Sequence, residues 1–460
     1  MVKKKPEGIC FISNKGETLP VAWELLKEGV PQNYFILDPT CRGAYAGLMP
    51  RIKLDGLQKA IERAQTIVID IILKNDQSPG HFAFLDKFNI PHSVPGLFGT
   101  LGDKLRKQYP EKDIVGGGRL PERWELNREE GIALAKKVGL SIPDYHKFTS
   151  LKEGARFLYN GPGKDKLWVF KPNDNLDLDL TKVDGFKGEL LDLLTQTYPK
   201  RLGDKVDFIL QERIDGQEVS SELWWDGKRF LHPNRTLEDK KLNDDNTGPA
   251  VGSQSNTFWK CKDMEGVVHK EMQGLAPFLQ GLILPVDANC IVTKDGRANF
   301  LEWTFRFGYS ALFLFLYLIK KGKLSNFFLK KFQTVFEEAF VASQVLTLHP
   351  FPKVREKPSF VQMVKDNLIN SPINTEGAWW VDVYQDSRGK LRCAGADGYL
   401  GVVMDKGATA EEAIKSAHKR LQTVKKAGIS GDLQHRSEAD HLSSHLGRLE
   451  MLEKWKVNIF

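Results

Sequence analysis

The chain has 460 residues, of which 41% are hydrophobic, 27% charged and 10% aromatic. This composition is typical of a globular protein of about two or three domains, and it excludes collagen-like, low-complexity and disordered chains. The formal net charge of +7 is compatible with phosphorylated ligands, but it is spread along the chain as on an ordinary solvated surface. We therefore expect no nucleic-acid partner.

The five cysteines show neither CxxC spacing nor Cys/His ligand spacing. They are too few for a disulfide scaffold, so we expect reduced thiols in a cytoplasmic chain. The apolar segment 9–12 has the length of one strand rather than of a signal peptide. The strongest apolar run, 311–319, is about half of what a bilayer crossing needs, so we expect a buried helix there and no membrane partner.

The first part of the chain alternates short apolar runs with a helical pattern at 19–28. This alternation predicts a parallel sheet, whose ligands bind at the carboxyl ends of its strands. The turn Asn14-Lys15-Gly16 offers backbone amides at a helix start, which is a natural anion site. A stretch rich in glycine and proline, 96–118, predicts a domain boundary. The predicted strands are 9–13, 34–37 and 66–73.

Capping residues and turn pairs mark the elements that follow. Asn127 with Glu130 predicts a helix start, and Gly139 its end. A second capping box, Thr409 with Glu412, predicts a helix near the end of the chain. Hairpins are expected at Asp226-Gly227 and at Lys294-Asp295-Gly296, since these are turn sequences between apolar runs. The expected strands are one ending in Lys171, then 207–212, 218–225, 290–293 and 299–305.

The run from Lys240 to Pro249 is predicted to be a long polar loop with two adjacent cations, Lys240 and Lys241. Such loops are often merely solvated, but loops held by rigid strands are also where binding residues concentrate. Lys171 leaves two readings open as well. It is either a cation for a phosphate or a surface lysine whose stem packs on apolar neighbours.

The strand 299–306 carries the strongest chemical pattern. Its period of two residues places Glu302, Thr304 and Arg306 on one face. A hard cation prefers oxygen ligands such as Glu302 and Thr304, and Arg306 would steady an anion beside it. The alternative is a salt-bridged strand that faces water. The sequence contains no GxSxG, Walker or HExxH motif.

Taken in order, these segments resemble the ATP-grasp superfamily, and most of all its glycinamide ribonucleotide synthetase family, which belongs to purine biosynthesis. The similarity is collinear over nearly the whole chain. It rests on the first turn and helix (13–23), the segment 142–148, DFILQERIDGQEVS (207–220), the TGP sequence (247–249), FLEWTFRFG (300–308), and 401–413.

The resemblance implies roles residue by residue. Matches to the nucleotide site are Arg128, Lys171, Gln211, Glu212, Ile214 and Glu218, of which Glu218 is the acid for the ribose hydroxyls. Matches to the metal site are Glu302, with Thr304 or Asn289 as second ligand. Matches to the catalytic cations are Lys240 and Arg306, and Arg306 would steady the developing oxyanion. Matches to the substrate site are Asn14, Lys15, Gly16, Lys241, Thr247, Gly248 and Pro249.

The chain departs from this family at four places. The family's glycine-rich phosphate loop is replaced by the acidic segment 173–179, and its second metal-binding asparagine by Thr304, for which Asn289 or Asp287 would compensate. The Arg and His that hold the ribose phosphate in the family are replaced by Glu17-Thr18-Leu19. The glycine-rich stretch after TGP is replaced by 250–254. The last two changes fall on the substrate side.

The resemblance implies an α/β protein of three parts. These are a Rossmann-like N-terminal domain (1–118), a central two-lobed ATP-grasp domain (119–345, mobile lobe about 150–213) and a small C-terminal α/β domain (346–460). The implied activity is ATP-dependent ligation of a carboxylate to an amine through an acyl phosphate, with ATP and Mg²⁺ or Mn²⁺, as in phosphoribosylamine–glycine ligation.

The expected partners are a small-molecule acid and a small-molecule amine, bound by a monomer or homodimer. Two alternatives remain open. One is a nucleotide-binding or scaffold protein that has kept the fold and lost turnover. The other is a ligase that joins an amino acid to a modified nucleobase.

Overall fold

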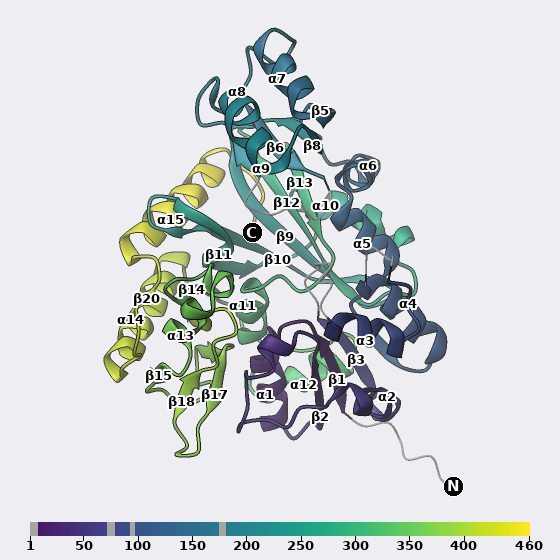
Figure 1. Cartoon of the computed structure of the whole chain (residues 1–460), viewed down its shortest axis with the longest axis vertical. Helices are drawn as coiled ribbons and strands as arrows, with labels where there is room; N and C mark the ends of the chain where they lie inside the picture. Colours follow the sequence, from purple (N-terminus) through teal and green to yellow (C-terminus); the bar gives the residue numbers. More distant parts are fainter. Residues whose placement is uncertain (1–7, 71–78, 93–96, 174–180) are drawn as a thin grey trace.

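The computed structural model describes residues 8–70, 79–92, 97–173 and 181–460 (Figure 1). Within these residues the strands form four sheets. Two sheets meet in the middle of the molecule, the small one drawn at the top of Figure 1 and the large one below it. The acidic segment that replaces the phosphate loop lies outside the described residues from position 174 to position 179.

The N-terminal sheet is parallel, with strand order β2-β1-β3-β4. Its central strands are buried on both faces, as expected for a parallel sheet covered by helices. The predicted strands and the helix at 19–28 are confirmed, and the third strand is described to Asp70. The elements are β1 (Ile9–Ser13), α1 (Leu19–Lys27), β2 (Gln32–Ile36), α2 (Leu54–Arg63), β3 (Thr66–Asp70), α3 (Pro79–Lys87), α4 (Leu97–Gln108) and β4 (Asp113–Val115).

Two helices, α5 (Arg119–Leu126) and α6 (Arg128–Val138), connect this sheet to the middle of the molecule. The start of α6 is as predicted, because the Asn127 side chain accepts hydrogen bonds from the backbone N–H groups of Glu129 and Glu130. Its end is also as predicted, because Gly139 takes a φ of 100° that favours glycine. Local sequence chemistry therefore fixes both ends of α6.

The small antiparallel sheet has strand order β5-β8-β6-β7. It encloses its own apolar core with the neighbouring helices, centred on Phe170, Phe208 and Leu194. It coincides with the segment expected to be a mobile lobe. Its elements are β5 (Tyr145–Ser150), α7 (Leu151–Tyr159), β6 (Trp168–Pro172), β7 (Lys182–Val183), α8 (Glu189–Asp192), α9 (Tyr198–Leu202) and β8 (Lys205–Glu212).

The large sheet is antiparallel, with strand order β13-β12-β9-β10-β11-β14-β19-β16, and β20 pairs with β14. Both predicted hairpins are confirmed, and the predicted buried helix is α11. The elements are β9 (Gln217–Trp225), β10 (Phe230–Asn243), β11 (Thr247–Lys260), α10 (His269–Met272), β12 (Leu284–Val292), β13 (Ala298–Thr304), α11 (Ala311–Tyr317), α12 (Leu324–Leu329), β14 (Phe340–Leu348), β16 (Ala378–Trp380), β19 (Tyr399–Gly407) and β20 (Leu433–Gln434).

The prediction of a long loop from Lys240 to Pro249 is wrong. Lys240 lies inside β10 and Pro249 inside β11, and Lys241 pairs with Ala250 across the hairpin. The turn is confined to 244–246, where Asp245 and Asn246 have positive φ angles. Cross-strand hydrogen bonds extend the hairpin past the apolar part of both strands, so the polar composition misled the prediction.

The C-terminal residues add strands and helices to the large sheet. The capping box predicted at Thr409 and Glu412 is confirmed. The Thr409 side chain caps α14, and the Glu412 carboxylate accepts a hydrogen bond from the Ala408 N–H. The domain boundary expected at residue 345 falls inside β14, which pairs with both β11 and β19. The remaining elements are α13 (Pro358–Val364), α14 (Ala410–Ala427), α15 (Glu438–Lys454) and a three-stranded sheet of β15 (Leu368–Ile369), β18 (Leu391–Cys393) and β17 (Val383–Gln385).

Helix α15 is tied to β10 by charge. Arg448 donates to the Asp239 carboxylate over 2.8 Å, and Arg436, at the start of this helical segment, pairs with Asp440. All five cysteines are buried free thiols. No helix among the described residues is long and apolar enough to cross a membrane.

Candidate functional site

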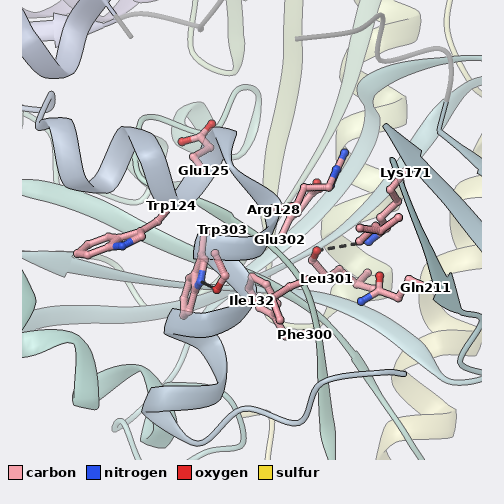
Figure 2. Close-up of a pocket in the computed structure, with 12 residues that line it drawn as sticks. Trp124, Glu125, Arg128, Ile132, Lys171, Gln211, Phe300, Leu301, Glu302 and Trp303 are labelled. Carbon is pink, nitrogen blue, oxygen red and sulfur yellow. Dashed lines mark hydrogen bonds between the residues drawn. The ribbon is translucent and has the colours of Figure 1, made fainter. Parts of the chain in front are cut away.

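A pocket lies between the small sheet, the large sheet and α6 (Figure 2). β6 and β8 of the small sheet form one side of the pocket, and β13 of the large sheet faces them. Part of the lining is apolar and part is charged, which suits a ligand with a flat apolar part and a charged end. The lining residues are Trp124, Glu125, Arg128, Gly131, Ile132, Lys171, Ile209, Gln211, Phe300, Leu301, Glu302 and Trp303.

Lys171 reaches into this pocket from the end of β6. Its ammonium group donates to the Leu301 carbonyl on β13 over 3.4 Å, so it spans the two sheets. The side chain is 8% exposed, and burial together with the Arg128 charge lowers its pKa to about 7. Among the described residues no carboxylate forms an ion pair with Lys171. The protein thus holds a buried cation whose natural complement is an anion from outside.

Arg128 is the first residue of α6, and it lies beside Lys171. Its Nε donates to the Pro172 carbonyl over 2.9 Å, which ties the helix start to the end of β6. Burial lowers the pKa of this guanidinium, while the Glu302 charge acts in the opposite direction. Arg128 and Lys171 therefore present two cations at the same end of the pocket.

A third cation, Lys240, lies near this end of the pocket, and its partners come from neighbouring strands of the large sheet. The Lys240 ammonium on β10 lies 2.7 Å from a carboxylate oxygen of Glu218 on β9 and 3.4 Å from one of Glu302 on β13. Asn289 on β12 donates to Glu218 over 2.9 Å. The Lys240 charge is the largest cause that holds the pKa of Glu302 at about 2, so this carboxylate is ionised at any ordinary pH.

Two further carboxylates lie near this array. Burial raises the pKa of Asp287 and of Glu238 to about 8 each, and other carboxylates add to the effect. Ser220 donates to Asp287 over 2.5 Å. Glu238 was missed by the sequence analysis; read as a strand, 230–243 would have placed it on the same face as Lys240. The site therefore has more acidic groups than its own cations neutralise.

The oxygen donors here fit a Mg²⁺ ion that is bound partly by protein side chains and partly by a phosphate of the substrate. Glu302 is ionised, and the Oδ1 atom of Asn289, its cross-strand neighbour, is buried without a hydrogen-bond partner. Thr304 lies opposite Asp287 in the same hairpin. No group of three His, Cys, Asp or Glu side chains in the described ranges is arranged to hold a metal by itself. Mg²⁺ is commonly bound by one or two carboxylates together with substrate phosphates, so Glu302 and Asn289 would suffice as its protein ligands.

Three of the residues that match the nucleotide site, Gln211, Glu212 and Ile214, lie at or just after the end of β8. Gln211 lines the pocket and is buried, and its Oε1 atom has no hydrogen-bond partner in the part of the chain that the structure describes. The Glu212 carboxylate turns outward to Lys166 over 2.9 Å, while its backbone N–H donates to the Asp144 carbonyl over 2.7 Å. Neither Glu212 nor Ile214 is among the pocket-lining residues.

Arg306 borders a second cavity, which lies between the end of β13 and the N-terminal part of the chain. Its Nε donates to Glu125 over 2.8 Å, a partner in α5 that the sequence did not suggest. Across this cavity, Glu122 accepts hydrogen bonds from the Phe98 and Gly99 amides, and burial raises its pKa to about 7. Glu125 lines both cavities, so the two spaces are neighbours.

The other predicted substrate residues lie in two separate places. Lys241, Thr247, Gly248 and Pro249 occupy the far part of the β10–β11 hairpin, where the Lys241 carbonyl accepts from Arg436 over 3.2 Å. Asn14, Lys15 and Gly16 form the turn between β1 and α1. The structure thus brings Arg128, Lys171, Gln211, Glu218, Lys240, Asn289 and Glu302 together, and leaves the hairpin tip and the first turn apart from them.

Comparisons with known proteins can be set beside this geometry. No protein-family profile matches the chain. The phosphoribosylamine–glycine ligase of Clostridium acetobutylicum is 24% identical over 384 residues, which cover 75% of this chain and 84% of that protein. The solved phosphoribosylamine–glycine ligase of Thermotoga maritima superimposes with a TM-score of 0.65 at 18% identity, covering 94% of this chain and 99% of that one.

A second solved structure, the complex of Campylobacter jejuni biotin carboxylase with β,γ-ATP, superimposes with a TM-score of 0.60 at 10% identity, covering 97% of each chain. The N5-carboxyaminoimidazole synthetase of Staphylococcus aureus does so with a TM-score of 0.52 at 9% identity, covering 91% of this chain and 99% of that one. The chain therefore has the multi-domain α/β ATP-grasp fold that its sequence predicts, and it resembles phosphoribosylamine–glycine ligase over most of its length.

Proposed function

We propose that the chain is an ATP-dependent carboxylate–amine ligase that uses ATP with Mg²⁺ or Mn²⁺ and forms ADP and phosphate. One observation carries the proposal: Arg128 and Lys171 line a pocket between two sheets together with the ionised Glu302, and Lys240 contacts the same carboxylate. Such an array neutralises the charge that builds on phosphoryl oxygens during transfer. The 24% identical ligase supports the same reaction class.

The proposed reaction has two steps. A carboxylate oxygen of the acid attacks the γ-phosphorus of ATP, and ADP leaves, so that an acyl phosphate forms. The amine then attacks the acyl carbon, phosphate leaves, and the amine nitrogen loses a proton. Lys171, Arg128 and Lys240 would hold the phosphates. Glu302 and Asn289 would hold the metal ion. Gln211 would contact the adenine base, and Glu218 the ribose hydroxyls.

The resemblance favours glycine with phosphoribosylamine as the substrate pair, because the relative of 24% identity is named for that pair. The first turn favours another amine, because it carries Glu17 and Thr18 where the family has Arg and His. The test is Mg²⁺-dependent ADP release with a panel of acids and amines that includes freshly made phosphoribosylamine with glycine. Release with that pair alone would identify a divergent purine enzyme, and release with another pair would name the substrates.

A matched pair of variants tests the metal assignment. We expect Glu302→Gln to lower the rate of ADP release about 10²- to 10³-fold, because it removes the charged oxygen that holds Mg²⁺ at the phosphates. Asp295→Asn, in the turn of the same hairpin, removes an exposed carboxylate and should leave the rate unchanged. If Glu302→Gln released ADP as fast as the unmodified chain, the assignment of Glu302 to the metal would be wrong.

A second candidate function is nucleotide binding without turnover. It is favoured by the contact of Lys240 with both Glu218 and Glu302, since an internal cation then competes with the metal for the same carboxylates. Tight ATP binding without ADP release across the panel would support this candidate, and turnover with any pair would exclude it.

A further inference from the structure

The turn between β1 and α1 stands at the carboxyl end of a parallel strand, beside the end of β3. Such a turn normally offers free backbone amides, and anions bind there. In this chain the turn also faces the loop before β19, because the Lys15 ammonium lies 3.8 Å from the Asp397 carboxylate. It is therefore a junction between the N-terminal sheet and the C-terminal part of the chain.

The amides of this turn are already used by the protein's own side chains. The Lys15 N–H donates to the Glu17 carboxylate over 3.2 Å, and the Thr18 N–H to the Asp70 carboxylate over 3.2 Å. The Gly16 N–H donates to the Ser13 hydroxyl over 2.9 Å. A phosphate would find these donors occupied and would meet two carboxylates, so the turn does not fit an anion.

The two carboxylates share one hydroxyl group. Ser13 Oγ lies 3.2 Å from Glu17 Oε2 and 3.2 Å from Asp70 Oδ2, and a hydroxyl has one hydrogen to give. Burial raises the pKa of Asp70 to about 8, and it raises that of Glu17 as well. Two negative charges side by side are therefore disfavoured at this turn unless a cation lies next to them.

Three buried oxygen atoms around the pair have no hydrogen-bond partner among the described residues. They are Asp70 Oδ1, Glu17 Oε1 and the hydroxyl of Tyr399, from three different elements. Asp70 is 1% exposed, yet one of its oxygens accepts no hydrogen bond from any residue that the structure describes. Burial raises the pKa of Tyr399, and the charges of Asp397 and Glu17 raise it further, so these groups face the same place. A buried acceptor without a donor is costly, and a ligand with N–H groups would remove that cost.

We propose that this turn binds the ammonium group of a cationic amine substrate, with Glu17 and Asp70 as its acceptors. The inference rests on the proposed ligase activity and narrows its amine to one that carries a second, positively charged amino group besides the reacting one. Lys15 is the internal cation that faces Asp397 until such a substrate binds.

The first experiment is calorimetric titration of the full chain, with 1,4-diaminobutane and ribose 5-phosphate as separate probes. We expect the diamine to bind and ribose 5-phosphate not to bind. The diamine should release protons near neutral pH, because a bound ammonium group favours the ionised form of Asp70, whose pKa burial raises to about 8. Titration in buffers of different ionisation enthalpy measures this release. The charged and titratable groups facing the pair are Lys15, Tyr34, Asp397 and Tyr399.

Variants tie the binding to the turn. Glu17→Gln keeps an acceptor for the Lys15 N–H and removes the charge, and it should weaken diamine binding about ten- to hundredfold. Lys15→Ala should strengthen it, because it removes the competing internal cation. Glu62→Gln, an exposed carboxylate on α2, is the matched control and should bind the diamine like the unmodified chain. Diamine binding that is the same in Glu17→Gln, or absent from the unmodified chain, would overturn the proposal.

Failure of this inference and failure of the ligase proposal are distinguishable. ADP release with glycine and phosphoribosylamine, together with binding of ribose 5-phosphate, would overturn the cationic site and leave the ligase proposal standing. Diamine binding that depends on Glu17, with no ADP release across the panel, would support the cationic site and count against turnover.

Discussion

At the scale of single residues, Lys171 has the most consequential environment. It is buried, within the described ranges it donates only to a backbone carbonyl, and its pKa is about 7. Its charge therefore depends on pH within the ordinary working range of an enzyme, whereas the charge of Glu302 does not. The cation that faces the pocket is the group that titrates there.

This difference predicts the pH dependence of nucleotide binding. Above about pH 7 free Lys171 loses its proton, so ATP affinity should fall by up to about tenfold per pH unit until the pKa of the bound state is reached. Below about pH 7 the affinity should level off. Lys171→Arg, which stays charged, should remove the dependence and serves as the control for the titration of ATP itself. A flat profile for the unmodified chain, measured by calorimetry, would contradict the burial of an unpaired Lys171.

At the scale of elements, α6 shows how far local sequence chemistry reaches. Asn127 caps the helix, and the next residue, Arg128, clamps it to the end of β6. Asn127→Ala should lower the free energy of unfolding by about 1 kcal/mol, because two backbone N–H groups lose their acceptor. Asn127→Asp keeps the acceptor and should stay close to the unmodified chain. Denaturant unfolding measures both, and equal loss in the two variants would show that the cap is not the cause.

The elements also show where prediction from sequence stops. The caps at Asn127 and Thr409 were predictable because their donors and acceptors lie within four residues of one another. The β10–β11 hairpin was misread as a loop, because its polar residues are held by partners across the sheet. Because the strand Phe230–Asn243 was not predicted, Glu238 was not recognised as a neighbour of Lys240.

In the site, the resemblance brought together Lys171, Glu218 and Glu302, and the structure places them around one pocket region. It did not suggest that Arg306 pairs with Glu125, because these residues are 181 positions apart in the chain. Nor did it suggest that Glu17 and Asp70 lie beside the same Ser13 hydroxyl, because Asp70 is 57 positions from Ser13 in the chain. Contacts of this kind depend on tertiary packing rather than on local pattern.

At the scale of the whole molecule, the large sheet runs without a break from the candidate site into the C-terminal part. β14 pairs with β11 on one side and β19 on the other, and α15 reaches back to Asp239, the neighbour of Lys240. The C-terminal region should therefore support the site as well as cover it.

A truncation tests this dependence. A chain that ends at residue 345 loses part of β14 and all of β19, α14 and α15, and it exposes buried strand residues such as Val341 and Val345. We expect it to lack a cooperative thermal transition and to bind no ATP. The full chain, purified in parallel, is the reference. A truncated chain that unfolds cooperatively and binds ATP would show that the central region folds independently.

The buried thiols can report on local opening of the molecule. Cys10 lies in the N-terminal sheet, Cys290 in the large sheet beside the candidate site, and Cys393 in the three-stranded sheet. A thiolate reacts, and burial raises the pKa of each of these groups, so a reagent in solution can modify them only when the surrounding sheet opens. The order in which the three become labelled reads out the order in which the three sheets come apart.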